Sequence, residues 1–271
     1  MEKMKKVIKK KSTKNLKCDI ELLINHLNKG GFDGEKVLVK PNFNTADPFP
    51  ASTDPDFLKA MVLVLKKIGF QKVIIGESST FYKSSEKVIN RKKLDEINSY
   101  DFVDLVNFDQ TEKIEKKIPE GNYLKKATVP KLLDEVDKVI YLPCVKTHFH
   151  AEYTGSLKLS VGLMSTLEKI KFHIKNLQEK IVELNKLVNP DLIIMDGRKC
   201  FIDGGPVNGT VKKPNEILAS TDRVAIDLEE VKLIKTFPGN SLEKRSPKKI
   251  PQIKKGIELG VGSADYELVE I

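Results

Sequence analysis

The chain has 271 residues and a formal net charge of +9, and 40% of its residues are hydrophobic. This length is enough for one large α/β domain with its own core. The three cysteines, Cys18, Cys144 and Cys200, show no C-x-x-C spacing, which argues against a disulfide framework, a zinc finger or an iron–sulfur cluster within the chain. No apolar run approaches the roughly 20 residues that span a bilayer. We therefore expect a cytoplasmic protein without a membrane partner.

The positive charge is concentrated at the N-terminus. Residues 1–17 contain eight lysines and one glutamate, a net charge of +7, so the rest of the chain carries only +2. Only four of the 47 basic residues are arginines, whereas proteins that read nucleic acids depend on the bidentate arginine side chain. We expect residues 1–17 to form a basic arm, with room for a short strand over 6–9, outside a single α/β domain of residues 18–271. Nucleic-acid binding through this arm is the less favoured alternative.

The first part of the chain alternates helical and strand patterns. Apolar residues at helical spacing predict a helix over 19–27, ended by Gly30-Gly31, and a strand follows over 36–40, closed by Pro41. Ser52-Thr53-Asp54-Pro55 is typical of a helix start, and Gly69 ends that helix before a strand over 72–75. Two strands joined by a helix are parallel, so the loops that follow them open on the same edge of the sheet.

Further strands and helices continue this alternation. We predict a mainly parallel, twisted sheet with helices on both faces, a Rossmann-like α/β fold. Gly204-Gly205-Pro206 neither follows a strand nor opens a helix at the required spacing, so we expect no dinucleotide fingerprint. The remaining predicted elements are strands over 102–108, 139–142, 191–195, 216–219 and 266–269, helices over 85–97, 130–136, 155–164, 174–188 and 220–231, and a hairpin or excursion within 111–127.

The most informative stretch follows the strand over 139–142, which Pro143 ends. We interpret residues 144–158 as a polar loop that leads into a helix. In open α/β sheets ligands lie outside the carboxyl ends of the strands, so we expect the loops over 42–50, 77–82, 144–158 and 196–209 to converge on one pocket. Its cations suit a small ligand that carries a carboxylate or phosphate. The candidate residues of this stretch are Lys146, Thr147, His148, His150, Gly155 and Lys158.

Each candidate residue has a chemical role and a structural alternative. His148 has an ordinary pKa near 6.5, so it could move a proton at neutral pH, and Glu77 at a strand end is the second catalytic candidate. The predicted ligand-binding residues are Asn42, Lys146, Thr147, Gly155 and Lys158. Lys158 would add its charge to backbone amides that already favour anions at a helix start. The alternatives are a hydrogen-bonded loop histidine and solvated lysines.

Seven sequence blocks occur in order over residues 36–235. The blocks are Val37-Leu38-Val39-Lys40-Pro41-Asn42, Thr53-Asp54-Pro55, Gly76-Glu77-Ser78, Leu142-Pro143-Cys144-Val145-Lys146-Thr147-His148, Thr154-Gly155-Ser156-Leu157-Lys158, Asp203-Gly204-Gly205-Pro206, and residues 219–227. With these blocks the chain resembles the family called domain of unknown function 362. Some members carry a ferredoxin-type cysteine segment, which implies a redox or cofactor-pathway partner, but this chain lacks those cysteines.

A more distant resemblance suggests chemistry. The order His148, Gly155, Lys158, His173 is similar to the N-terminal domain of nickel-pincer lactate racemases. That resemblance implies that His148 exchanges a proton, Lys158 anchors a cofactor or anion, and His173 binds a divalent metal, with His150 as a second candidate ligand.

Two residues of the racemase pattern are missing. That pattern has an arginine after its first strand and a second catalytic histidine after the next, where this chain has Lys40-Pro41-Asn42 and Gly76-Glu77-Ser78-Ser79. Two functions therefore stay open for the same pocket, an enzyme that uses His148 for proton transfer and a non-catalytic protein that carries or senses a cofactor.

Overall fold

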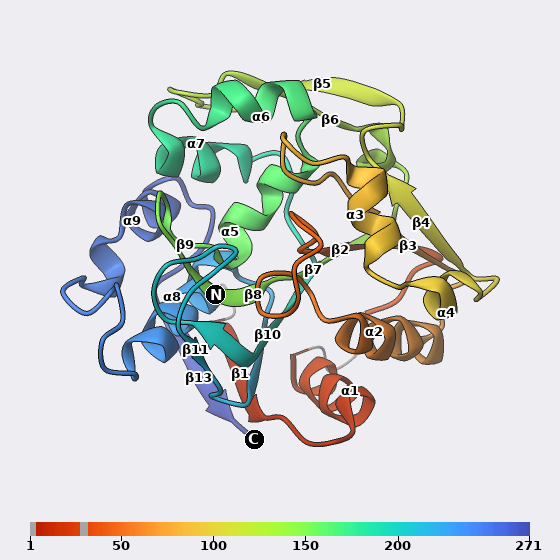
Figure 1. Ribbon diagram of the computed structural model, residues 1–271, viewed down its shortest axis with the longest axis horizontal. Coiled ribbons are helices and arrows are strands. Elements are labelled where there is room, and N and C mark those ends of the chain that lie inside the picture. The colour runs from red at the N-terminus through yellow and green to blue at the C-terminus, as the bar shows by residue number, and fades with distance from the viewer. Residues whose placement is uncertain (1–3, 28–31) are drawn as a thin grey trace.

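A mostly parallel β-sheet forms the centre of the computed structural model, which describes residues 4–27 and 32–271 (Figure 1). Its strand order is β13-β1-β12-β10-β7-β2-β3-β4, and along this path β12 is the strand that runs antiparallel to both neighbours. The predicted parallel α/β sheet is confirmed. The bounds are β1 Lys5–Lys11, β2 Lys36–Pro41, β3 Lys72–Glu77, β4 Val103–Asn107, β7 Lys138–Leu142, β8 Cys144–His148, β9 Glu152–Tyr153, β10 Leu192–Phe201, β11 Val211–Lys212, β12 Glu216–Ser220 and β13 Tyr266–Glu270.

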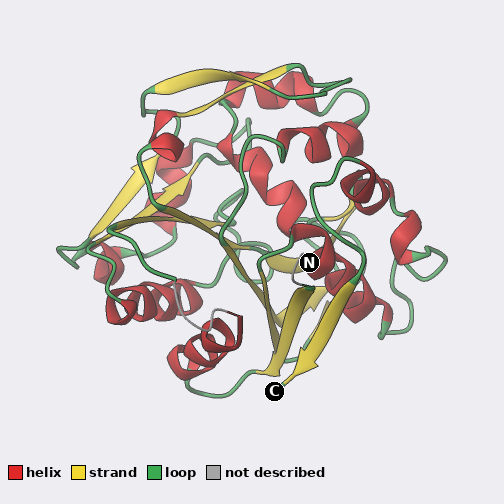
Figure 2. Ribbon diagram, turned by 180° about the vertical axis from the view of Figure 1, so that it is seen from behind, coloured by secondary structure: helices red, strands yellow, loops and turns green. Residues whose placement is uncertain are grey.

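Helices cover both faces of the sheet, as the views from the two sides show (Figures 1 and 2). Successive strand residues point to opposite faces, so Val37 and Val39 pack in the core that also contains helices α1 and α2, whereas Leu38 packs in the core of α5, α7, α8 and α9. The bounds are α1 Leu16–Leu27, α2 Pro55–Ile68, α3 Ser85–Arg91, α4 Asp95–Asn98, α5 Gly155–Leu159, α6 Thr166–Phe172, α7 Leu177–Leu184, α8 Arg223–Lys235 and α9 Pro251–Glu258.

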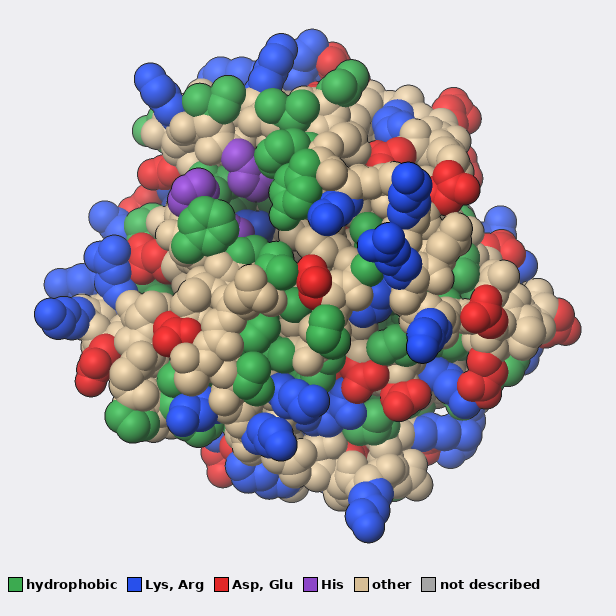
Figure 3. Space-filling view, in the orientation of Figure 1, with side chains coloured by type: hydrophobic (Ala, Val, Ile, Leu, Met, Phe, Trp, Pro, Cys, Tyr) green, Lys and Arg blue, Asp and Glu red, His purple; other side chains and the backbone are tan. Residues whose placement is uncertain are grey.

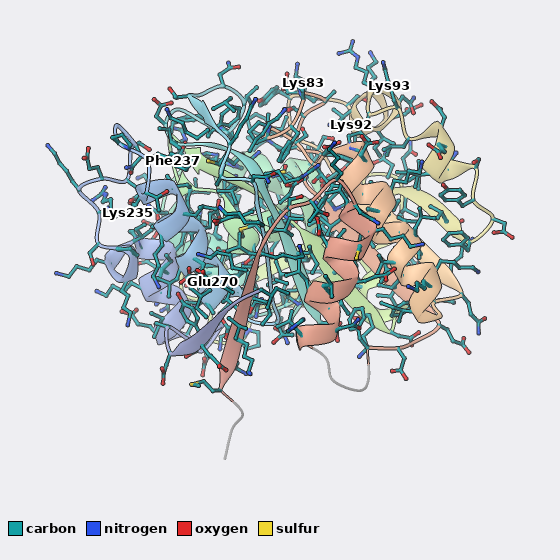
Figure 4. All side chains as sticks on the ribbon, turned by 90° about the horizontal axis from the view of Figure 1, so that it is seen from below. Lys83, Lys92, Lys93, Lys235, Phe237 and Glu270 are labelled. Carbon is teal, nitrogen blue, oxygen red and sulfur yellow. The ribbon has the colours of Figure 1, made fainter. Side chains whose placement is uncertain are left out.

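The N-terminal segment is part of the sheet. Strand β1 lies between β12 and β13, and α1 already begins at Leu16. The expectation of a basic arm outside the domain is therefore wrong for residues 5–17, because backbone pairing outweighs their charge. Figure 4 shows Glu270 beside this strand, and its carboxylate pairs with Lys9 at 2.5 Å. Residues 1–3 of the expected arm and the Gly30-Gly31 helix stop lie outside the described residues.

Several predicted helices are shorter or broken. The helix expected over 85–97 is split into α3 and α4, because Lys93 adopts a left-handed φ of 54°. The helix expected over 174–188 begins only at Leu177, after Asn176 in a left-handed conformation. The 111–127 excursion is a separate hairpin of β5 (Lys113–Lys117) and β6 (Lys126–Pro130), which contacts α6 (Figure 2). Within the described chain, no helix has the length and apolar character needed to cross a membrane.

The prediction of a loop over 144–158 is wrong for residues 144–148. Pro143 interrupts the ladder, but the chain continues directly as strand β8, in which every residue is buried. Strand β8 pairs with the far half of β10, with Cys144 opposite Asp196 and Lys146 opposite Phe201. The polar side chains of β8 are therefore held at fixed positions inside the molecule rather than in a loop at its surface.

Candidate active site

The sheet topology brings four connections together. From β2 the chain order runs outward through β3 and β4, and β7 then enters on the other side of β2, so the order reverses between β2 and β7. Ligands of open α/β sheets bind at such a point. A cavity of about 40 Å³ lies there, and the residues that matter most for its chemistry are Lys40, Asn42, Glu77, Lys146, Thr154 and Lys158. The predicted convergence of these strand ends thus holds for the connections after β2, β3 and β7, and Pro206 adds the one after β10.

Helix α5 presents Lys158 to this cavity, and Asp227 of α8 fixes the start of that helix. One carboxylate oxygen of Asp227 accepts hydrogen bonds from Ser156 N and Ser156 Oγ, both at 2.7 Å, and the other accepts from Leu157 N at 3.1 Å. Burial raises the pKa of Asp227 to about 6 despite these donors. Gly155 allows the close approach, because its φ is +57° and a Cβ there would lie 2.5 Å from Asp227 Oδ2.

The amine of Lys158 has no counter-charge. It forms no hydrogen bond or ion pair with any residue in the described ranges 4–27 and 32–271, and the residue is half-buried. Burial, and next the positive charges of Lys146 and Lys169, lower the pKa of Lys158 to about 7. The hydroxyl of Thr154, which lines the same cavity, is also buried without a hydrogen-bond partner. A cation and a hydroxyl without partners therefore border one cavity.

Lys146 supplies a second cation from strand β8. Its Nζ donates to the carbonyl oxygens of Ala51 at 2.5 Å and Pro206 at 3.3 Å, and it forms no ion pair within the described chain. Burial lowers the pKa of Lys146 to about 8. The nearby carboxyl of Glu230 does not cancel this charge, because burial raises its pKa well above the ordinary value and favours its neutral form.

A buried ion pair closes the opposite wall. Lys40 Nζ lies 2.6 Å from Glu77 Oε1, and both side chains are almost wholly buried. Glu77 also accepts hydrogen bonds from Ser78 N at 2.8 Å and from Phe43 N at 2.7 Å. Burial lowers the pKa of Lys40, which the charge of Glu77 opposes. Because both oxygens of Glu77 are engaged, its geometry favours holding the loops in place over moving a proton.

His148 lies in β8 next to the cavity rather than in its lining. Its Nδ1 accepts hydrogen bonds from the backbone N–H groups of His150 at 3.1 Å and Ala151 at 3.2 Å, so the neutral ring carries its proton on Nε2. Burial, and next the charge of Lys158, lower the pKa of His148 far below its ordinary value. His148 is therefore a neutral imidazole at pH 7 in this state, because the cations around it disfavour a second proton.

The other two histidines of this region lie nearer the surface. Figure 3 shows histidine side chains gathered beside hydrophobic ones on this face. His173 Nδ1 donates a hydrogen bond to the carbonyl oxygen of Lys169 at 2.7 Å, and His150 is exposed. Across the residues described, no group of three or more His, Cys, Asp or Glu side chains is suited to hold a metal ion. Metal binding by His173 and His150 therefore stays a prediction without a larger ligand group behind it, and we derive no step through a metal.

Three other predicted ligand-binding residues remain. Thr147 and Gly155 do not line the cavity, whereas Asn42 does. Thr147 is buried in β8, where its backbone pairs with Tyr153 of β9 and its hydroxyl has no hydrogen-bond partner among the described residues. Gly155 acts by letting α5 approach Asp227. Asn42 lines the cavity, and Thr53 Oγ1 fixes its backbone by accepting from Asn42 N at 2.8 Å.

Sequence reasoning missed Lys169. This buried residue of α6 donates to Ser78 O at 2.7 Å, Ser78 Oγ at 2.6 Å and Ser79 O at 2.9 Å, and thereby fixes the connection after β3. Burial lowers its pKa to about 8. No signal in the sequence indicates this role, because the acceptors of Lys169 come from a connection about 90 residues earlier in the chain.

The family model called domain of unknown function, DUF362, matches residues 37–231. The chain belongs to the DUF362 family. The matched range runs from β2 into α8 and so contains the residues of the cavity described above. The seven resembling blocks had indicated this family from the sequence.

Two further comparisons describe proteins to which this DUF362 protein is similar. A thylakoid-associated protein of Synechocystis sp. is 25% identical over 213 residues, which are 76% of this chain and 64% of that protein. The lactate racemase apoprotein of Thermoanaerobacterium thermosaccharolyticum is similar in structure with a TM-score of 0.49 and 13% identity, over 84% of this chain and 57% of the racemase chain. This chain thus spans somewhat less than two thirds of the length of each.

Proposed function

We propose that this DUF362 protein binds a small carboxylate- or phosphate-bearing ligand in the cavity, with Lys158 and Lys146 contributing charge and Thr154 and Asn42 contributing polar groups. The observation that carries the proposal is the pair of unpartnered groups, the Lys158 amine and the Thr154 hydroxyl, which border the same cavity. Buried hydroxyls such as that of Thr154 are normally hydrogen-bonded, and a nearby opposite charge stabilises the charged form of a half-buried lysine such as Lys158. An anion would provide both missing partners.

The charges around the cavity support an anion and not a cation. Lys146, Lys158 and Lys169 form no ion pairs in the described chain, and the charge of Lys158 is disfavoured by the other two. The carboxylate that lines the cavity, Glu77, is already paired with Lys40. A bound anion would lower the repulsion among these lysines, and this effect is strong where water is excluded.

The size of the cavity limits the ligand. A buried water needs roughly 10–15 Å³ of comparable volume, so about 40 Å³ accommodates roughly three waters. This fits a phosphate group or a carboxylic acid of two or three carbons better than a nucleotide.

An enzymatic role would use His148. Its Nε2 is the ring nitrogen that the backbone leaves available, and a bound anion would raise its pKa by offsetting the nearby lysines. His148 would then move a proton to or from the ligand through Nε2. If ligand turnover by the full chain does not fall when His148 is replaced by alanine, the carrier function is favoured instead.

Calorimetric titration of the full chain with inorganic phosphate and with acetate tests the binding proposal. We expect Lys158→Met to weaken binding at least about tenfold, which corresponds to about 1.4 kcal/mol, and Thr154→Val to weaken it less. Lys254→Met is the matched control, because Lys254 is an exposed lysine of α9. Unchanged affinity in Lys158→Met would rule out the proposed site.

A further inference from the structure

The lysines around the cavity differ in how their amines are held. Lys40 is paired with Glu77, Lys146 donates to two carbonyl oxygens, and Lys169 donates to three oxygen atoms. Lys158 alone among these four has no such partner in the described chain. No hydrogen bond therefore fixes the orientation of the Lys158 amine, which can turn towards the cavity.

Two lysines of different character lie in the same cavity wall. A lysine becomes a nucleophile when burial or a neighbouring cation keeps its amine unprotonated. Lys158 meets both conditions, since burial and the charge of Lys146 bring its pKa to about 7, while the pKa of Lys146 is about 8. At neutral pH more of Lys158 than of Lys146 is uncharged, and the two carbonyl oxygens that accept from Lys146 favour its charged form. One can attack a carbonyl carbon while the other holds an anion.

We propose that Lys158 forms an imine with a small 2-oxo acid whose carboxylate is held by Lys146. This inference rests on the proposed anion site and names the class of ligand that it would take. The carbonyl and carboxylate of a 2-oxo acid are on adjacent carbons, so both fit a cavity of about 40 Å³. The unpartnered Thr154 hydroxyl can donate to the carbonyl oxygen during attack.

The reaction balances without an added oxidant or reductant. The neutral amine of Lys158 attacks the carbonyl carbon, a C–N bond forms, and the carbonyl oxygen takes up a proton to give a carbinolamine. The C–O bond then breaks, the two amine hydrogens leave with the oxygen as water, and a C=N bond remains. Protonation of the imine nitrogen gives an iminium ion, a known means of activating the neighbouring carbon.

Reductive trapping tests the inference on the full-length chain. Glyoxylate is added with cyanoborohydride, which transfers hydride to the iminium carbon and leaves a stable carboxymethyl group on the lysine. Peptide mapping by mass spectrometry then measures modification at each lysine. At pH 7 we expect Lys158 to be modified at least about tenfold faster than the exposed Lys254, because a lower pKa leaves more neutral amine. Inorganic phosphate should slow the labelling of Lys158 and leave that of Lys254 unchanged.

The variants and the phosphate titration separate the two proposals. Lys158→Met should lose the rapid phase of labelling, whereas Lys254→Met should keep it. If Lys158 is labelled no faster than Lys254, or if Lys158→Met keeps the rapid phase, the imine is ruled out. If phosphate binding nevertheless depends on Lys158, the anion site stands without the imine. If phosphate binding does not depend on Lys158, the proposed function fails as well.

Discussion

A half-buried lysine without a counter-charge, such as Lys158, makes the folded protein less stable than an apolar residue at the same position would. The pKa of Lys158 is about 7 in the folded chain, below the ordinary 10.5, so between these values the unfolded state binds more protons and stability rises with pH. Below pH 7 both states are protonated and the full cost is present.

We therefore expect Lys158→Met to be more stable than the natural chain at pH 6, by about 0.5–2 kcal/mol. The difference should decline as the pH rises from 7 towards 10.5. Urea unfolding at several pH values measures it, with Lys254→Met as the control. Lower stability of Lys158→Met at pH 6 would show that the lysine has a partner that stabilises its charge.

A substitution in the Lys40–Glu77 pair should lower the stability of the folded protein, whereas Lys158→Met should raise it. Glu77→Gln leaves the buried Lys40 amine without its counter-charge and removes one acceptor for the amides of Phe43 and Ser78. Breaking a buried pair on one side costs about 3–5 kcal/mol. The double variant Lys40→Met with Glu77→Gln should recover part of this loss in urea unfolding. A single variant within 1 kcal/mol of the natural chain, on the order of the error of such measurements, would show that the pair does not hold the loops.

Several residues of the site could be predicted from the sequence, because the carboxyl ends of parallel strands lie at the same edge of a sheet. Lys158, Lys146, Asn42 and Glu77 all line the cavity as expected. The partners of their side chains could not be predicted, since they come from segments distant in the chain. Glu77, expected as a catalytic residue, has its oxygens engaged by Lys40 and two amides. The ring of His148 is likewise fixed by backbone N–H groups that only the tight turn after β8 provides.

Strand β8 and helix α5 show why element boundaries near the site were harder to predict. Pro143 and the polar residues after it are typical of a loop, but the edge of β10 beyond its pairing with β7 offers backbone partners to residues 144–146. Such pairing depends on the three-dimensional position of β10 and leaves no local signal. The predicted helix over 155–164 is instead α5 followed by a 3₁₀ turn over Ser160–Leu163.

Gly155 is expected to control the position of helix α5. Gly155→Ala combines a left-handed backbone with a Cβ 2.5 Å from Asp227 Oδ2, and the backbone strain alone costs about 1–3 kcal/mol. Gly260→Ala is a matched control, because Gly260 has a φ of +63° and no atom within 4 Å of the added Cβ. We expect both variants to lose stability in urea, Gly155→Ala more, and only Gly155→Ala to lose phosphate affinity. Equal effects of the two variants would contradict this role.

The positive charge of the N-terminal strand β1 is largely paired with carboxylates of the folded domain. Four lysines of β1 form ion pairs with carboxylates of neighbouring elements: Lys6 with Glu267 at 2.9 Å, Lys9 with Glu270 at 2.5 Å, Lys10 with Asp19 at 2.9 Å and Lys11 with Glu216 at 2.6 Å. The charge run gave no indication of this pairing, because the carboxylates come mostly from the far end of the chain. These pairs reduce the charge that β1 can offer to a nucleic acid.

Removal of residues 1–11 should therefore damage the fold. The deletion takes out a strand that lies between β12 and β13 and contributes the buried Val7 and Ile8. We expect a lower unfolding temperature and loss of a single cooperative transition by circular dichroism. A truncated chain with unchanged unfolding would show that the segment is a removable tail, and salt-dependent nucleic-acid binding lost on truncation would then support the alternative function.

Proton uptake on ligand binding tests the anion site most directly. At pH 8 Lys158 is mostly neutral in the ligand-free chain, since its pKa is about 7, and a bound anion favours the protonated amine. Calorimetric titration with acetate, which is ionised at both pH values, in buffers of different ionisation enthalpy measures the protons taken up. We expect clear uptake at pH 8, little uptake at pH 6, and lower uptake in Lys158→Met, in which Lys146 and Lys169, both with a pKa of about 8, account for the remainder. Binding without proton uptake at pH 8, or uptake that is undiminished in Lys158→Met, would contradict an anion held by Lys158.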